Sequence, residues 1–280
     1  MRRLRIVHET GFRYDGETRA SYNEARMQPA SGGHQWVLSS ELEITPGAHV
    51  FSFWDYWRTQ VAAFEVLIPH HELMLTATSL VEVQDRQFGS QQFGWEDIGR
   101  AATRQTGLVE TLAPTKLTAA PEEVVELARE LSDGVPPSAA AEAICLAIGE
   151  AIEYVPGATL VTSTAAEVWA EKRGVCQDIT HVCLGALRSV GIPARYASGY
   201  IAPKGKAELG EPVKGESHAW VEWFTGQWNG FDPTNARPIG DMHVVVGRAR
   251  DYDDVPPLRG VYTGPDSSEL FVSVTVTLEM

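Results

Sequence analysis

The order of hydrophobic patterns along the chain restricts its fold more than any single residue does. Over residues 1–85, short runs rich in branched and aromatic residues alternate with turn formers, which is typical of strands. Helical periodicity takes over at residues 121–131, 138–152 and 176–190, and strand patterns return from residue 194 onward. This order predicts an α+β chain in which an amino-terminal β-sandwich precedes a unit of helices and strands.

The length of 280 residues fits about two domains. We expect a β-sandwich over residues 1–85. Residues 86–120 show only weak hydrophobic periodicity, so we expect a linker there. The remaining residues, 121–280, are expected to form a second unit that closes with the cleanly alternating strand at 269–278.

Charge and composition argue against several classes of partner. The net charge of −14 is unfavourable for binding nucleic acid or anionic membrane surfaces. No apolar run approaches the ~20 residues of a membrane span, and the basic start lacks the apolar segment of a secretory signal. The three cysteines do not form a disulfide framework, so we expect free thiols and a cytoplasmic location.

Cys176 is the candidate nucleophile. It follows a glycine-led loop and begins the apolar helical stretch 176–190. A thiol at that place lies near the positive end of the helix dipole, which favours the thiolate form. Catalysis by a thiolate also needs a nearby imidazole to hold it and to protonate the leaving group.

His218 and Asp232 supply an imidazole and a carboxylate on what reads as one hairpin. The two predicted strands flank the short turn Thr225-Gly226-Gln227. Paired positions that sum to 452 make Asp232 the diagonal neighbour of His218, and a register summing to 450 places it directly opposite. Both registers put the two side chains on one face, whereas a two-residue loop would separate them.

Each of these residues taken alone is more often structural, and their joint order favours a catalytic interpretation. His181 points about 140° away from Cys176 around an ideal helix, so we expect it to be structural. Asp178 lies in the first helical turn and is expected to anchor it. The remaining candidates are Cys145 and Cys183, expected in the core, and His243, His70 and His71, which have no visible partners.

These motifs resemble the transglutaminase-like superfamily, in particular its bacterial two-domain members. The matching stretches are residues 154–159, 174–178, 187–200, 217–222, 231–235 and 247–257. Residues 8–29 and 66–70 resemble the β-sandwich amino-terminal region of the same group. Residues 54–60 depart from it, since relatives tend to have an Asp-x-x-Gly-Asn turn there, but this weakens no catalytic inference.

The resemblance implies a papain-like transglutaminase core, with the helix that carries the cysteine packed on an antiparallel sheet. Cys176 would be the nucleophile, His218 the base and Asp232 its orienting group. The backbone N–H of Cys176 and the hydroxyl of Tyr154 would meet the oxyanion, with a packing role as the alternative for Tyr154. Asn235 would assist the histidine or serve as a turn residue. No cofactor or metal is implied.

The expected reaction is attack on an amide through a thioester. Hydrolysis of a peptide or isopeptide bond is favoured, so the expected partner is a peptide or protein amide substrate. Transfer to an amine and a noncatalytic binding module on the same fold stay open as alternatives, as does homo-oligomer formation. The lack of a calcium-loop pattern argues against a calcium-activated cross-linking enzyme.

Overall fold

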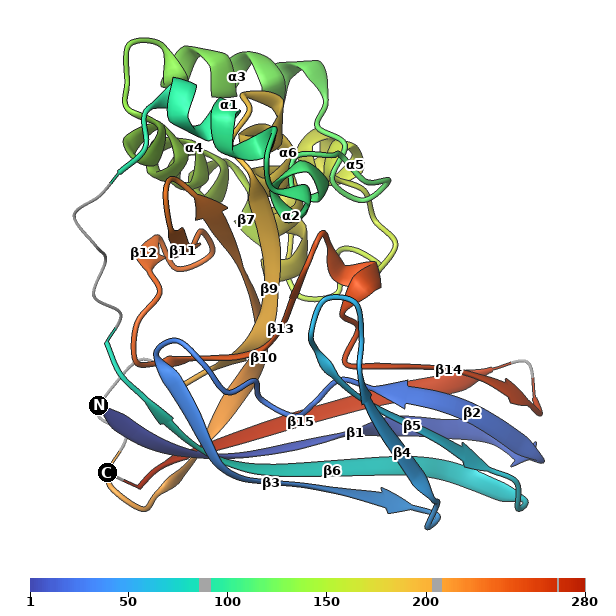
Figure 1. The fold of residues 1–280 in the computed structure, drawn as a ribbon. Helices are drawn as coiled ribbons and strands as arrows, with labels where there is room; N and C mark the ends of the chain where they lie inside the picture. Colours follow the sequence, from blue (N-terminus) through green and yellow to red (C-terminus); the bar gives the residue numbers. More distant parts are fainter. Residues whose placement is uncertain (86–91, 203–207, 266, 280) are drawn as a thin grey trace.

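The computed structural model describes residues 1–85, 92–202, 208–265 and 267–279. Figure 1 shows two lobes, one made of strands and one in which helices cover the end of a sheet. The first lobe begins with β1 (Arg2–Thr18), β2 (Ala20–Ala25), β3 (Gln35–Thr45), β4 (Val50–Trp54), β5 (Gln60–Val66) and β6 (His70–Val83). The helices are α1 (Trp95–Ala102), α2 (Thr106–Glu110), α3 (Glu122–Ser132), α4 (Pro137–Ala151), α5 (Ala165–Glu171) and α6 (Cys176–Ser189).

The remaining strands lie between and after these helices. They are β7 (Glu153–Tyr154), β8 (Arg173–Gly174), β9 (Ala194–Ile201), β10 (Pro212–Phe224), β11 (Trp228–Asp232), β12 (Arg237–Pro238), β13 (His243–Ala249), β14 (Leu258–Thr263) and β15 (Ser268–Leu278), with a 3₁₀ turn at Tyr252–Asp254. The chain is therefore α+β, as the sequence predicted.

Two antiparallel sheets face each other in the strand lobe. One has the order β14-β2-β5-β4, and the other contains β15-β1-β6-β3. Alternate residues of β6 are buried, as expected for a strand with one face in a core. Leu73 and Leu75 of β6 pack with Phe64 and Val66 of β5, so both sheets contribute to one hydrophobic core.

The last two strands return to the strand lobe. β15 pairs antiparallel with β1 along most of its length, and β14 pairs with β2. Sequence patterns alone place these strands with residues 121–280, because pairing between the two ends of a chain leaves no local signal. The segment 86–120, expected to be a linker, carries α1 and α2 in its described part. These helices are too short to show clear periodicity.

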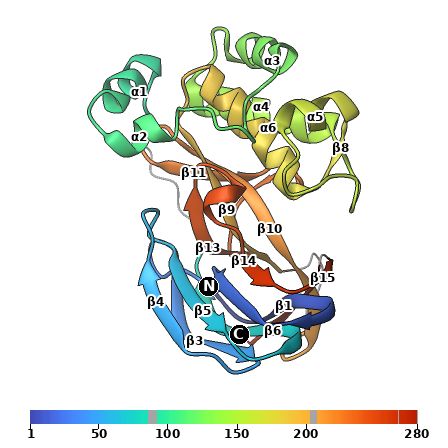
Figure 2. The ribbon, with the colours of Figure 1, turned by 90° about the vertical axis from the view of Figure 1, so that its right-hand side faces the viewer.

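Strand β10 joins the two lobes. Its first residues, from Pro212 to Gly215, pair with β15, and the following residues pair with β9. The result is a nine-stranded sheet that runs through both lobes. Figure 2 shows β10 passing from beneath the helices into the strand lobe.

Side chains add further links between the lobes. The Gln35 amide donates to the carbonyl of Val245 (2.7 Å) and accepts from its N–H (2.9 Å), so it extends the edge of β13. The Tyr200 hydroxyl donates to the Met27 carbonyl at 2.9 Å and contacts Nδ1 of His8 at 3.0 Å. These bonds fix the strand lobe against the sheet that carries His218.

Helix α6 is the centre of the other lobe. It is buried from Gln177 to Arg188 and packs against α3, α4 and α5 on one side and against β9 and β10 on the other. A helix that is apolar around most of its circumference needs such burial on several sides. The helix therefore presents its first residue, Cys176, at one end of a rigid core.

Gly149 sets the distance between α4 and the turn after β11. A Cβ added at Gly149 would lie 2.3 Å from the carbonyl oxygen of Pro233. The helix can approach this turn so closely only because residue 149 lacks a side chain. The position of Asp232, which precedes Pro233, depends on that contact.

We predict that Gly149→Ala destabilises the protein by about 1–3 kcal/mol, because the added methyl group forces α4 away from Pro233. Gly99→Ala is the matched control, since Gly99 is an exposed residue of α1 and a Cβ there meets no atom within 4 Å. It should stabilise the protein by up to about 1 kcal/mol. Urea unfolding of both variants measures the difference, and equal stabilities would contradict the described contact.

Candidate active site

Asp178 shapes the loop that precedes Cys176. Its Oδ2 atom accepts hydrogen bonds from the N–H of Val175 at 2.8 Å and from the hydroxyl of Thr159 at 2.6 Å. A Cβ on Gly174 would lie 2.9 Å from the same oxygen, so the loop requires glycine at that position. Burial raises the pKa of Asp178, although these two hydrogen bonds lower it. As expected, Asp178 anchors the loop.

Cys176 is the first residue of α6 and is half-buried. The backbone N–H groups in the first turn of a helix have no acceptor within the helix. The N–H of Cys176 is one of them, so a donor and the positive end of the helix dipole lie next to the thiol. This arrangement favours negative charge at this end of α6.

The hairpin of β10 and β11 brings His218 and Asp232 together. Val221 pairs with Phe231, and Phe224 pairs with Trp228, so paired positions sum to 452. This is the first of the two registers considered from the sequence. His218 Nε2 lies 2.9 Å from Asp232 Oδ2, and both side chains are almost fully buried.

Asp232 accepts hydrogen bonds from three residues. Besides His218, Asn235 binds it twice, through its side-chain amide at 2.7 Å and its backbone N–H at 3.1 Å. His243 Nε2 lies 3.3 Å from the same Oδ2 atom. The N–H of Gly240 donates to His243 Nδ1 at 3.2 Å, so the proton of a neutral His243 sits on Nε2 and points at Asp232.

His243 contacts Asp232, although no sequence pattern links the two residues. It lies on β13, which pairs with β9 and not with the hairpin of His218 and Asp232. No local spacing relates it to either residue, so only the order of strands in the sheet reveals the contact. Asn235, in contrast, is only three residues past Asp232. Its backbone N–H donates to the Asp232 carboxylate, as in a turn that begins at an aspartate.

The electrostatics of the site keep His218 and Asp232 charged at neutral pH. Burial lowers the pKa of His218, but the hydrogen bonds and charges of Asp232 and Cys176 outweigh it and raise this pKa to about 10. Burial raises the pKa of Asp232, but hydrogen bonds from His218 and His243 hold it far below its usual range. An imidazolium therefore lies between the Asp232 carboxylate and the Cys176 thiol. Since Nε2 binds Asp232, Nδ1 is the nitrogen left for the thiol.

Cys176 and His218 line a cavity of about 210 Å³ between the two lobes. Its other walls include Tyr196 of β9, and Thr10 and Val272 of the strand lobe. A cavity of this size holds roughly seven water molecules or about one side chain. The strand lobe thus forms part of the wall around the thiol.

Two tyrosines lie near Cys176. Tyr154, the predicted oxyanion donor, pairs with Gly174 and is partly exposed. Burial and the negative charges of Cys176 and Glu216 raise the pKa of Tyr154 to about 12, so its hydroxyl keeps its proton. Tyr196 is buried and lines the cavity, and burial followed by the charge of Cys176 raises its pKa well above the usual value. No local sequence pattern indicates that Tyr196 lines the same cavity as Cys176.

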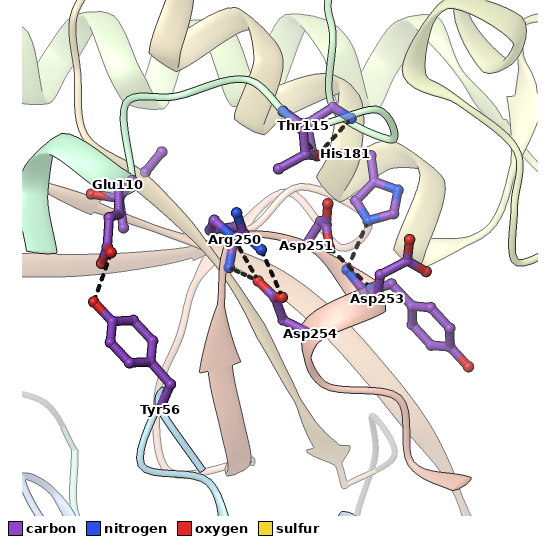
Figure 3. A network of polar contacts seen from close by, with 12 residues as sticks. Tyr56, Glu110, Thr115, His181, Arg250, Asp251, Asp253 and Asp254 are labelled. Atoms are coloured by element: carbon purple, nitrogen blue, oxygen red, sulfur yellow. Dashed lines mark hydrogen bonds and ion pairs between the residues drawn. The ribbon is translucent and has the colours of Figure 1, made fainter. Parts of the chain in front are cut away.

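Among the other candidate residues, His181, Cys145 and Cys183 lie in the core. His181 accepts the N–H of Tyr252 at 3.2 Å, and burial lowers the pKa of His181 to about 3, so it is neutral (Figure 3). Cys145 and Cys183 are fully buried neighbours, and burial raises the pKa of Cys183 well above its usual value. His70 contacts the Ile68 carbonyl at 2.8 Å and lies outside the site.

Within the described ranges, His, Cys, Asp and Glu form no group of three or more that could hold a metal ion. In the same ranges, no helix has the length and apolar character needed to cross a membrane.

Known proteins share this architecture over the whole chain. Residues 4–82 match the bacterial transglutaminase-like N-terminal region, and residues 125–233 match the transglutaminase-like superfamily. The uncharacterized protein ML0607 of Mycobacterium leprae is 38% identical over 277 residues, covering 99% of each chain. The uncharacterized protein Rv2569c of Mycobacterium tuberculosis is 33% identical over an alignment of 297 residues, covering 98% of this chain and 92% of the relative.

A crystal structure from Cytophaga hutchinsonii, of a protein proposed to be a cysteine protease, superposes with a TM-score of 0.75 at 17% identity. It covers 99% of this chain and 97% of the other, so the two folds agree throughout. The chain belongs to the transglutaminase-like superfamily and combines the bacterial amino-terminal region with the transglutaminase-like core.

The raised pKa of His218 predicts a pH-dependent stability. A folded pKa of about 10 against ~6.5 in the unfolded chain means that the charged His218 stabilises the fold fully below pH ~6.5. This contribution is lost as the pH rises through about 10. His218→Gln should therefore destabilise the protein most at pH 6 and least at pH 10, as measured by urea unfolding. The exposed His49→Gln is the control, and a pH-independent effect of His218→Gln would contradict the shift.

Proposed function

We propose that this protein is a cysteine-dependent amidase that hydrolyses a peptide or isopeptide bond through a thioester. The observation that carries the proposal is the position of His218, which binds the Asp232 carboxylate and the Cys176 thiol at once. Cys176 is the nucleophile, His218 the general acid and base, and Asp232 the group that orients the imidazole.

In the first half of the reaction, the Cys176 thiolate attacks the amide carbonyl carbon and a C–S bond forms. The His218 imidazolium donates its proton to the amide nitrogen, the C–N bond breaks, and the amine leaves. In the second half, neutral His218 takes a proton from water while the water oxygen attacks the thioester. The C–S bond then breaks, which releases the acid and restores the thiolate and the imidazolium.

The developing oxyanion would be met by the backbone N–H of Cys176 and by a tyrosine hydroxyl. Tyr154 keeps the role proposed for it from the family resemblance, because its hydroxyl is protonated and close to the charge of Cys176. Tyr196, which lines the cavity, also carries a protonated hydroxyl and is the competing donor.

Water is favoured over an amine as the acceptor because of the size of the cavity. An amine would have to bind beside the acyl group, whereas about 210 Å³ accommodates roughly one side chain. Hydrolysis needs only a water molecule next to His218.

The thiol chemistry can be tested without a substrate. We predict that iodoacetamide at pH 7 labels Cys176 at least tenfold faster than Cys145 or Cys183, because a paired thiolate reacts and buried thiols do not. His218→Gln should remove most of the Cys176 rate, while the exposed His49→Gln should leave it unchanged. Mass spectrometry of the tryptic peptides gives the three rates. An unchanged Cys176 rate in His218→Gln would refute the pairing.

The acceptor can be tested with a peptide library that contains glutamine and branched amide bonds, incubated with and without a primary amine. We predict products with the mass of added water in both reactions and none with Cys176→Ala. Products that carry the amine in place of water would identify a transferase. Cys176→Ala as active as the parent chain would refute the proposed nucleophile.

A further inference from the structure

A second, larger cavity lies away from the thiol. Its volume is about 530 Å³, and it shares no lining residue with the cavity of Cys176. The turn between β4 and β5 forms one wall, α2 forms another, and β9 and β13 supply the floor. Nothing in the proposed reaction uses this space.

Arginines dominate its charged wall. Arg195 and Arg248 stand on the paired strands β9 and β13 and both donate to the same Oε2 atom of Glu222, through their Nε atoms at 2.8 Å. Glu222 is fully buried, while the arginine side chains are 22% and 26% exposed. The two guanidiniums therefore lie between a buried carboxylate and the cavity. Among the residues that the structure describes, the two guanidiniums share this one carboxylate.

A third arginine projects from the turn between β4 and β5. Arg58 has a φ of 62°, a left-handed conformation that is strained for a residue with a side chain. Asp55 holds the turn with two hydrogen bonds. Its backbone carbonyl accepts the N–H of Arg58 at 3.0 Å, and its side-chain Oδ1 accepts the N–H of Thr59 at 2.9 Å. Arg58 forms no ion pair with any residue that the structure describes.

Aromatic rings complete the wall. The guanidinium carbon of Arg195 lies 3.8 Å from the ring centre of Trp228. Trp57 precedes Arg58 in the turn between β4 and β5 and also lines the cavity. Glu110, the acidic residue on the rim, accepts a hydrogen bond from the Tyr56 hydroxyl at 2.6 Å, which ties the turn to α2 (Figure 3). Among the described residues of this wall, the arginines Arg58, Arg195 and Arg248 outnumber the acids Glu110 and Glu222, in a chain of net charge −14.

We propose that this cavity binds a small ligand in which a carboxylate or phosphate group is attached to a flat apolar group. The oxyanion would be held by Arg248 and Arg58, because guanidinium groups match the geometry of planar and tetrahedral oxyanions. The flat group would lie against Trp57 and Trp228. This site does not depend on the activity proposed for Cys176.

Isothermal titration calorimetry with four probes tests the proposal. Benzoate and phenyl phosphate carry both parts of the ligand, inorganic phosphate lacks the ring, and benzamide lacks the charge. We expect one-to-one binding of benzoate or phenyl phosphate, at least tenfold tighter than that of benzamide. Which of the two binds more tightly distinguishes a carboxylate from a phosphate ligand. Absence of binding by both, or equal binding of benzamide, would overturn the proposal.

Two arginine variants locate the site. Arg248→Gln should weaken binding of the preferred probe at least tenfold. Arg58→Gly should weaken it severalfold and should fold well, because glycine adopts the left-handed conformation without strain. Arg129→Gln removes the same charge from the exposed surface of α3 and should leave binding unchanged. Equal effects of Arg129→Gln and Arg58→Gly, or unchanged binding in Arg58→Gly, would overturn the proposal even if Arg248→Gln failed to fold.

Discussion

The carboxylate of Asp232 is the group on which the rest of the site depends. It is fully buried, and a buried charge is tolerated only where hydrogen bonds and opposite charges compensate for lost hydration. His218, His243 and Asn235 supply these partners. Each partner comes from a different part of the sheet or its turns, so the carboxylate can be satisfied only when β10, β11 and β13 are all in place.

The shared strand β10 explains why a β lobe accompanies this core. The strand lies in the sheet of the strand lobe up to Gly215 and pairs with β9 from Glu216 onward. His218 follows directly after this change of partner. The position of the imidazole is therefore fixed from both lobes, and the strand lobe also contributes wall residues to the cavity of Cys176. We infer that the strand lobe helps to build the site, because it positions His218 and lines the cavity.

Contacts between residues that are close in sequence could be predicted, whereas contacts between distant strands could not. The parity of His218 and Asp232 followed from one short hairpin turn, and Cys176 followed from a helix boundary next to a glycine loop. His243 could not be found in this way, because β13 pairs with β9 across the sheet. The return of β14 and β15 to the first strands was hidden for the same reason, since strand patterns do not name their partners. Tyr196 sits in a correctly predicted strand, but its proximity to the thiol depends on how α6 packs on that strand.

¹⁵N NMR of the histidine side chains can show whether His218 is an imidazolium held between Asp232 and Cys176. We expect both ring nitrogens of His218 to carry protons at pH 8 and the ring to titrate near pH 10. In Asp232→Asn, the imidazolium should be lost at a lower pH because the carboxylate no longer stabilises it. A His218 ring that is neutral at pH 8 and titrates near the ordinary value of ~6.5 would show that the carboxylate and the thiol do not hold an imidazolium.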